Sequence, residues 1–178
     1  MIVFLRFIGV VNAAIWLGTS IFFSFGAGPA LFSGDMRALL GANNFPYYSG
    51  AIARIVLSSY FHFHVACGII ALLHLMAEKL YLGRPPSKFI TSLLIGILTI
   101  TMIGGLWMQP KMHDLHVAAY ATKATPAERV AAMHSFRAWH GASQIINLFI
   151  ICGILIYAWR VNNPPDTTTF VRPGKFGG

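Results

Sequence analysis

The chain has 178 residues, of which 56% are hydrophobic and only 10% are charged. Because soluble domains carry about 25% charged residues, this composition excludes an ordinary soluble protein and indicates a membrane protein. The net charge of +8 would suggest nucleic-acid binding in a soluble chain, but here the basic residues flank apolar segments, where they favour lipid headgroups. We therefore expect the lipid bilayer, and no nucleic acid, as a partner.

Four apolar segments are long enough to cross a membrane, since a hydrocarbon core about 30 Å thick requires roughly 20 apolar residues per helix. They cover about residues 8–32, 55–75, 89–108 and 141–159. The first is too long for a signal peptide and has only Arg6 as an early charge, so we interpret it as a true span. The predicted fold class is all-α: an integral membrane four-helix bundle over residues 1–161.

The connection between spans three and four predicts helices that project beyond the bilayer. Thr125-Pro126-Ala127-Glu128 is a capping box with proline at the first helical position, which is typical of a helix start. A helix from there to Arg160 would be about 52 Å long at 1.5 Å per residue, which exceeds the hydrocarbon core by about 20 Å. We expect span three to continue past Pro110 as the other arm of this hairpin.

The C-terminal tail, residues 162–178, is rich in proline, threonine and glycine. A segment of this composition does not bury enough apolar surface to fold alone. We expect it to be extended and docked on a partner, so that other membrane-protein subunits join the lipid bilayer as expected partners.

The basic residues favour a topology with both termini in the cytoplasm, in a bacterial-type inner membrane. Seven are expected on the side of the termini: Arg6, Lys79, Arg84, Lys88, Arg160, Arg172 and Lys175. Six are expected on the other side: Arg37, Arg54, Lys111, Lys123, Arg129 and Arg137. The margin that decides this orientation is a single charge.

Two histidines, His62 and His64, lie near the middle of span two, and an ionisable residue at this depth suggests a functional site. Residues two apart point about 200° apart on a helix, so the two side chains face opposite ways. His64 shares a face of small residues with Cys67 and Gly68, which suits close packing inside a bundle. We therefore favour His64 as the inward residue; the alternative for either histidine is a hydrogen bond that only joins two helices.

His140 begins span four and precedes Asn147 by almost two helical turns. Two neutral imidazoles that face each other across a bundle can ligate a haem iron or hold a metal ion. The first cofactor we expect is haem b, bound through His64 and His140, and the alternative is copper or zinc held by the same two residues with His62 and Cys67. A difference in membrane depth of about 9 Å between His64 and His140 counts against direct pairing.

Arg54 and Arg137 flank one side of the predicted bundle. The simpler interpretation is that both extend to lipid headgroups. The alternative is a pair of cations that hold an anionic group, such as a haem propionate or a lipid phosphate. The sequence contains no HExxH, CxxC, GxGxxG or Walker motif, so we expect no enzymatic activity.

Short motifs along the chain resemble a known family. They are Trp16-Leu17-Gly18, Phe45-Pro46-Tyr47, His64 with Gly68, Trp107-Met108-Gln109-Pro110-Lys111, and His140-Gly141-Ala142-Ser143 with Asn147. In order and spacing they resemble the transmembrane protein 205-like family, also catalogued as domain of unknown function 4149. That family is distantly similar to four-helix copper-resistance and haem-associated membrane proteins.

The resemblance covers about residues 7–159 and implies a four-helix membrane protein without an established reaction. It singles out five residues, and His62 is not among them: His64, Trp107, Pro110, His140 and Asn147. On this ground Trp107 and Asn147 join His64, His140, Arg54 and Arg137 as candidates for cofactor binding.

Three functions stay open at this point. The first is a small integral membrane subunit of a larger redox or energy-transducing assembly, in which haem b would carry electrons. The second is a transporter or resistance protein for a metal ion or a small molecule, with the histidines and Cys67 along its path. The third is a purely structural membrane subunit, in which the histidines only join helices.

Overall fold

The computed structural model describes residues 2–83 and 87–163, and every regular element in this part of the chain is helical. The elements are α1 (Ile2–Phe22), η1 (Phe23–Ala27), α2 (Gly28–Ala30), α3 (Gly34–Leu40), α4 (Phe45–Leu82), α5 (Lys88–Ile103), η2 (Gly104–Met108), α6 (Gln109–Tyr120) and α7 (Pro126–Asn162), where η1 and η2 are π-helical. No break separates α1, η1 and α2, or α5, η2 and α6, so each set forms one continuous rod. With α4 and α7 they make four rods.

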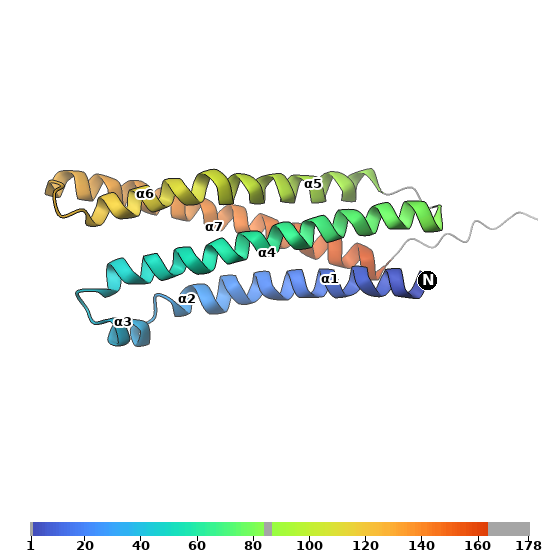
Figure 1. Ribbon diagram of the computed structural model, residues 1–178, viewed down its shortest axis with the longest axis horizontal. Helices are drawn as coiled ribbons and strands as arrows, with labels where there is room; N and C mark the ends of the chain where they lie inside the picture. The colour runs from blue at the N-terminus through green and yellow to red at the C-terminus, as the bar shows by residue number, and fades with distance from the viewer. Residues whose placement is uncertain (1, 84–86, 164–178) are drawn as a thin grey trace, which may run out of the picture.

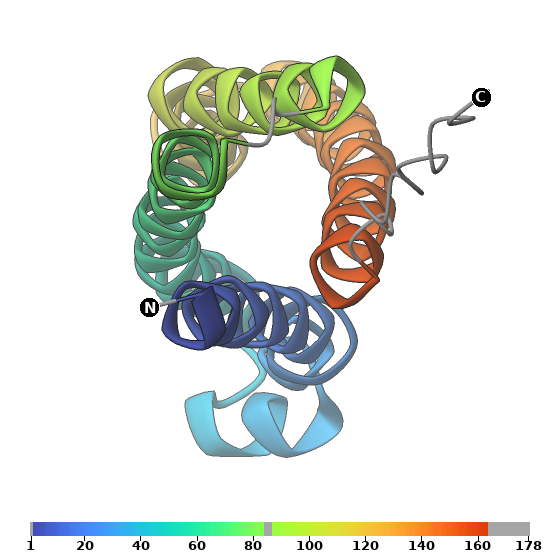
Figure 2. The same cartoon turned by 90° about the vertical axis from the view of Figure 1, so that its right-hand side faces the viewer.

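The four rods lie side by side, and the short helix α3 lies at one end of the bundle (Figure 1). Seen end on, they surround a common axis in the order α1, α4, α5–α6 and α7 (Figure 2). α7 runs obliquely, since it packs against α6 near its start and against α1 near its end (Figure 1). The prediction of an all-α four-helix bundle is confirmed.

Each rod is long and apolar enough to cross a membrane. The four candidate spans are Val3–Ala30, Phe45–Tyr81, Lys88–Tyr120 and Pro126–Asn162. The longest of them, with 37 residues, measure about 55 Å at 1.5 Å per residue, well beyond a hydrocarbon core of about 30 Å. The protein is therefore an integral membrane protein, and its longest helices exceed the thickness of a hydrocarbon core.

Charged residues mark the same apolar band on three rods. The distance along the helix is about 36 Å from Arg54 to Glu78 on α4, and about 34 Å from Arg137 to Arg160 on α7. It is again about 34 Å from Lys88 to Lys111 on the α5–α6 rod. This common spacing matches a bilayer's hydrocarbon core with its edges. The start of α7 and the end of α6 lie beyond the band, as the projecting hairpin requires.

The start of α7 is the one predicted from its capping box. The hydroxyl of Thr125 accepts from the backbone N–H of Glu128 at 3.3 Å, and the carboxylate of Glu128 accepts from the backbone N–H of Thr125 at 2.8 Å. These two bonds satisfy donors that a helix start leaves free. Because nothing interrupts the helix afterwards, α7 continues from the projecting end through the bilayer to Asn162.

The hydrophobic core fills the half of the bundle that contains the start of α1 and the end of α7. Its buried members are Ala13, Trp16, Cys67, Ala71, Leu75, Ile90, Leu94, Ile97, Ile150, Ile154, Tyr157, Ala158 and Val161. Trp16, Leu94, Ile154 and Tyr157 are completely enclosed. In lipid, such close packing stabilises a bundle through dispersion contacts rather than through exclusion of water.

Glycines allow the helices of this half to approach closely. A Cβ atom at Gly68 would lie 2.2 Å from the side chain of Leu98, and one at Gly153 would lie 2.9 Å from Ile97. A Cβ atom at Gly9 would lie 2.5 Å from Nε2 of His74, whose ring donates a hydrogen bond to the backbone oxygen of Leu5 at 3.0 Å. His74 therefore joins α4 to α1 through a contact that only glycine permits.

The docked tail lies outside the described residues from position 164 onward. The orientation of the termini and the identity of the membrane stay predictions.

We expect Gly9→Ala to destabilise the protein by about 1–3 kcal/mol, because the added methyl group overpacks the contact with His74. Gly18, also on α1, is the matched control, since a Cβ atom there meets open space. Gly18→Ala should be neutral or stabilising by up to about 1 kcal/mol. Reversible unfolding with sodium dodecyl sulfate in mixed micelles measures both. Equal free energies of unfolding for the two variants would contradict the contact.

Candidate functional site

A cavity of about 560 Å³ lies among the four rods, in the half of the bundle remote from the packed core. All four rods contribute to its wall. On α4 the lining runs from Gly50 to His64, which is about 21 Å at 1.5 Å per residue. On α7 it runs from Phe136 to Ile151, about 22 Å. The cavity is therefore elongated along the helices and begins where the core ends.

Most of the wall is apolar, and one side of the cavity opens to the surroundings. Its aromatic and aliphatic side chains include Phe23, Phe61, Met108, Met112, Phe136 and Ile146. Four large hydrophobic residues of the lining are more than half exposed: Phe25 (68%), Phe32 (52%), Ile145 (61%) and Leu148 (54%). Phe25 belongs to η1 and Phe32 follows α2, while Ile145 and Leu148 lie on α7 inside the apolar band. The opening therefore faces the hydrocarbon of the bilayer.

Both π-helical segments form part of the cavity wall, η1 through Phe23 and Ser24 and η2 through Gly104 and Met108. Short π segments within helices occur frequently at functional sites. A Cβ atom at Gly104 would lie 2.8 Å from Cε1 of Phe61. The glycine thus leaves space for the Phe61 ring beside η2.

His64 closes the end of the cavity that adjoins the hydrophobic core, which we call the inner end. The side chain is 1% exposed, so it faces inward, as the pattern of small residues predicted. The indole N–H of Trp16 donates to Nδ1 of His64 at 3.2 Å, and Nε2 lies 3.2 Å from Oγ of Ser20. The hydroxyl of Ser20 donates to the backbone oxygen of Trp16 at 2.7 Å. The ring is thereby fixed between α1 and α4.

These bonds assign the protonation state of His64. An indole N–H can only donate, so Nδ1 is the acceptor and carries no proton. Nε2 then carries the proton and donates to Ser20, whose own proton goes to the Trp16 carbonyl. The imidazole is neutral, and both of its nitrogens are used within the protein.

The arrangement does not fit an axial ligand at His64. Iron, copper and zinc bind a free imidazole lone pair, whereas Nδ1 of His64 already accepts from Trp16 and Nε2 carries a proton. Haem b bound through His64 and His140 stays a prediction, and it would require the bonds to Trp16 or Ser20 to break.

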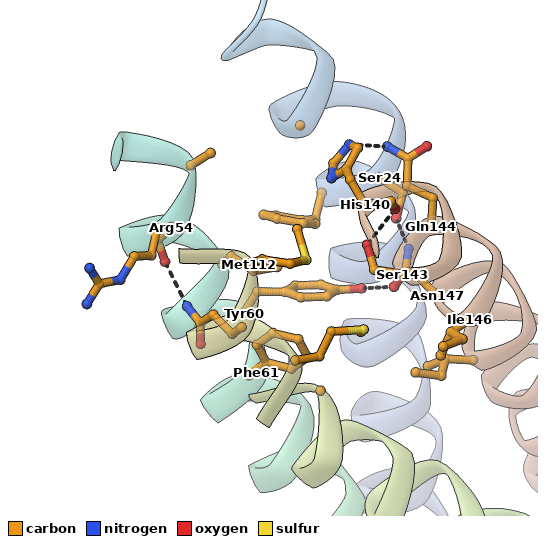
Figure 3. A pocket seen from close by; sticks show the side chains of 18 of the residues that line it. Ser24, Arg54, Tyr60, Phe61, Met112, His140, Ser143, Gln144, Ile146 and Asn147 are labelled. Carbon is orange, nitrogen blue, oxygen red and sulfur yellow. Dashed lines mark hydrogen bonds between the residues drawn. The ribbon is translucent and has the colours of Figure 1, made fainter. Parts of the chain in front are cut away.

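A second set of hydrogen bonds crosses the middle of the cavity (Figure 3). Tyr60 donates its hydroxyl proton to Oδ1 of Asn147 at 3.0 Å, and Nδ2 of Asn147 donates to Oγ of Ser24 at 2.7 Å. The ring of Tyr60 stacks on Phe23 at 4.1 Å and lies 4.2 Å from the ring of His64. Asn147 therefore links α7 to both α4 and η1.

Polar residues at helical spacing continue along the cavity side of α7 (Figure 3). We call His140, Ser143, Gln144 and Asn147 the polar stripe. The hydroxyl of Ser143 donates to the backbone oxygen of His140 at 2.7 Å, and Nε2 of Gln144 lies 2.9 Å from Nε2 of His140. The imidazole of His140 stacks on the ring of Phe136. The stripe is a row of uncharged hydrogen-bonding groups in an otherwise apolar wall.

Arg54 belongs to the wall near the outer end, but its guanidinium points away from the other labelled side chains (Figure 3). Its Nη1 lies 2.9 Å and 3.2 Å from the two ring nitrogens of His113. The amide of Gln109 donates to the backbone oxygen of Arg54 at 3.1 Å. These contacts join α4 to α6. Arg137 is exposed on α7 and does not line the cavity, so the two arginines do not converge on it.

Of the residues predicted for a site, the cavity brings together His64, His140, Asn147 and Arg54. Trp107 is not part of its lining, since the side chain is 56% exposed and packs edge-on against Trp139.

The set predicted for copper or zinc does not assemble. His62 is exposed and donates to the backbone oxygen of Ser58 at 2.8 Å, and Cys67 is buried in the hydrophobic core. Over residues 2–83 and 87–163, no three His, Cys, Asp or Glu side chains are grouped so that they could hold a metal ion.

Sequence reasoning missed the residues of α1 and η1 that complete the site. Trp16, Ser20 and Ser24 recur every four residues, so they share one face of an otherwise apolar helix. This polar face was the available signal, because polar side chains within a span join neighbouring helices. The structure places them beside His64, Tyr60 and Asn147.

We expect Trp16→Phe to destabilise the protein by about 1–3 kcal/mol, because it leaves Nδ1 of His64 buried without a donor. Trp159→Phe is the control, since Trp159 is 72% exposed, and it should change stability by less than about 0.5 kcal/mol. A double-mutant cycle with His64→Leu, measured by unfolding in mixed micelles, should give a less than additive loss. Additive losses would contradict the Trp16–His64 bond.

Comparison with known proteins identifies a family. A family model described as "Domain of unknown function (DUF4149)" matches residues 11–121, from within α1 to just past the end of α6. A search of curated proteins and a search of solved structures each find no significant match. The finer likeness to transmembrane protein 205 and to copper-resistance proteins stays an expectation. Because the model matches more than half of the chain, the protein belongs to the DUF4149 family.

Proposed function

We propose that the protein binds a lipid-soluble small molecule in its intramembrane cavity and exchanges it with the bilayer. This is the small-molecule form of the transporter or resistance function considered from the sequence. The observation that carries the proposal is an apolar cavity of about 560 Å³ with a polar stripe on one wall. Binding sites for small molecules are concave, mostly apolar and equipped with a few placed polar groups.

The side opening supports entry from the membrane. The exposed lining residues Phe25, Ile145 and Leu148 are apolar, so a molecule dissolved in lipid meets no polar barrier there. The inner end is closed by His64 and by the core beneath it. This conformation therefore favours a binding protein over an open channel.

Two other functions were considered from the sequence, a subunit of a larger assembly and a purely structural subunit, and neither depends on the cavity. Membership of a larger redox or energy-transducing assembly stays a prediction that depends on the tail and on subunits outside this chain. A purely structural role would give the cavity and the polar stripe no part in function, and a binding measurement separates it from the proposal.

Trp16 provides a reporter for the proposal. Its indole is completely buried and bonded to His64 at the inner end of the cavity. The other tryptophans, Trp107, Trp139 and Trp159, are replaced by phenylalanine. A stearic acid methyl ester with a nitroxide at mid-chain, titrated into phosphatidylcholine nanodiscs, should quench Trp16 fluorescence in a saturable manner, because the nitroxide reaches the indole from the cavity.

Filling the cavity should weaken this binding. Ala53→Phe places an aromatic ring among the lining residues. It should raise the probe concentration at which quenching is half-saturated by about tenfold or more, which is a loss of about 1.4 kcal/mol in binding free energy. Ala66→Phe is the matched control, since Ala66 is on the exposed face of the same helix. Quenching that rises in proportion to the probe and is equal in both variants would reject the proposal.

A further inference from the structure

We infer that the ligand is a neutral amphiphile whose polar end carries hydrogen-bond acceptors, such as carbonyl oxygens, and that the polar stripe of α7 binds this end. The inference rests on the proposed function and names the class of molecule that the same cavity takes.

The charges around the cavity argue for a neutral molecule. Among the described residues the lining contains no aspartate or glutamate, and its one formal cation, Arg54, points its guanidinium away from the polar stripe, where it contacts His113 (Figure 3). A charged group moved from water into an apolar site is strongly disfavoured unless an opposite charge meets it there. A cation bound at the polar stripe therefore finds no carboxylate beside it, and an anion bound there finds no guanidinium.

The hydrogen bonds of the polar stripe argue for acceptors on the ligand. The amide nitrogen of Gln144 can only donate, so Nε2 of His140 accepts and the proton of this neutral ring is on Nδ1. Each amide group carries two N–H donors, and the bonds described use one of them in Gln144 and one in Asn147. Nδ1–H of His140 and one N–H of each amide are thus three donors available to a ligand, whereas Oε1 of Gln144 is the one amide oxygen of the stripe without a bond to the described residues, since Oδ1 of Asn147 accepts from Tyr60.

The position of these donors fits the polar end of a membrane molecule. Along α7, His140 lies about 4.5 Å further into the apolar band than Arg137, and Asn147 lies about 10 Å beyond His140. A polar end bound near His140 therefore stays close to the membrane interface. The apolar remainder extends past Phe61 towards His64, beside the wall of phenylalanine, methionine and isoleucine side chains.

Three probes with the same nitroxide-labelled chain test the inference in the protein that retains Trp16 alone. One ends in a methyl ester, one in a sulfonate, and one is a plain hydrocarbon. We expect the ester to saturate Trp16 quenching at about fivefold lower concentration than the hydrocarbon, which is the effect of one hydrogen bond of ordinary strength. The sulfonate should bind more weakly than the ester.

Gln144→Met removes one of the three donors, and the double variant His140→Leu/Gln144→Met removes two of them, so the two variants should bring the ester stepwise towards the level of the hydrocarbon. His134→Leu is the matched control, since His134 is exposed on the same helix and does not line the cavity; it should leave the order of the probes unchanged. Gln144→Met keeps the test available if the double variant does not fold.

The outcomes separate this inference from the proposed function. Tighter binding of the sulfonate would overturn the neutral ligand, and equal binding of ester and hydrocarbon would overturn recognition by the polar stripe. In both cases saturable quenching still supports the cavity as a binding site. If none of the probes saturates, the proposed function itself fails.

Discussion

The hydrogen bonds to the two ring nitrogens of His64 hold together the layer of the bundle that separates the packed core from the cavity. The arrangement of the helices on both sides depends on this layer. In hydrocarbon, a buried imidazole nitrogen without a partner is costly, and Trp16 and Ser20 satisfy both nitrogens while the ring stays neutral. Tyr60 lies against the same ring and binds Asn147, so α1, α4 and α7 are joined within one layer. On one side of this layer the helices pack closely, and on the other side they enclose the cavity.

The oblique course of α7 explains why the two halves differ. α7 packs against α1 near its end and against α6 near its start (Figure 1). It therefore moves away from α2 as it approaches the projecting end. The first rod also stops at Ala30, and the chain turns there into α3, so no helix replaces it beside α7. The exposed Phe25, Ile145 and Leu148 lie along this separation. The opening thus follows from helix lengths and directions rather than from a special loop.

The sequence predicted the individual helices better than the contacts between them. Hydrophobic segments long enough to cross a bilayer and the capping box at Thr125 were sufficient for four spans and for the projecting start of α7, because both signals are local. The inward face of His64 also followed from helical spacing. The partners of His64 did not, since Trp16 and Ser20 belong to another helix and periodicity does not give the rotation of one helix against another.

The same limit applies to the paired site expected for His64 and His140. Both residues line one cavity, but Gln144 and Trp16 occupy ring nitrogens that the prediction left free. The π-helical segments carry no periodic signal that distinguishes them from the α-helix around them.

The layer of hydrogen bonds around His64 closes one end of the cavity. It therefore limits where a molecule in the cavity can go without a change in the conformation of the protein. A molecule in the cavity meets lipid through the opening beside α7 and meets the packed core at its inner end. Exchange with the half of the bilayer on the cavity side therefore needs no helix to move. Passage to the other side would have to separate Trp16 and Ser20 from His64 and open the contacts of Gly68 and Gly153, where helices already touch. In the bilayer the separated imidazole would find no water to replace these bonds, so the layer resists opening. The geometry thus favours capture and release on one side of the membrane over transfer across it.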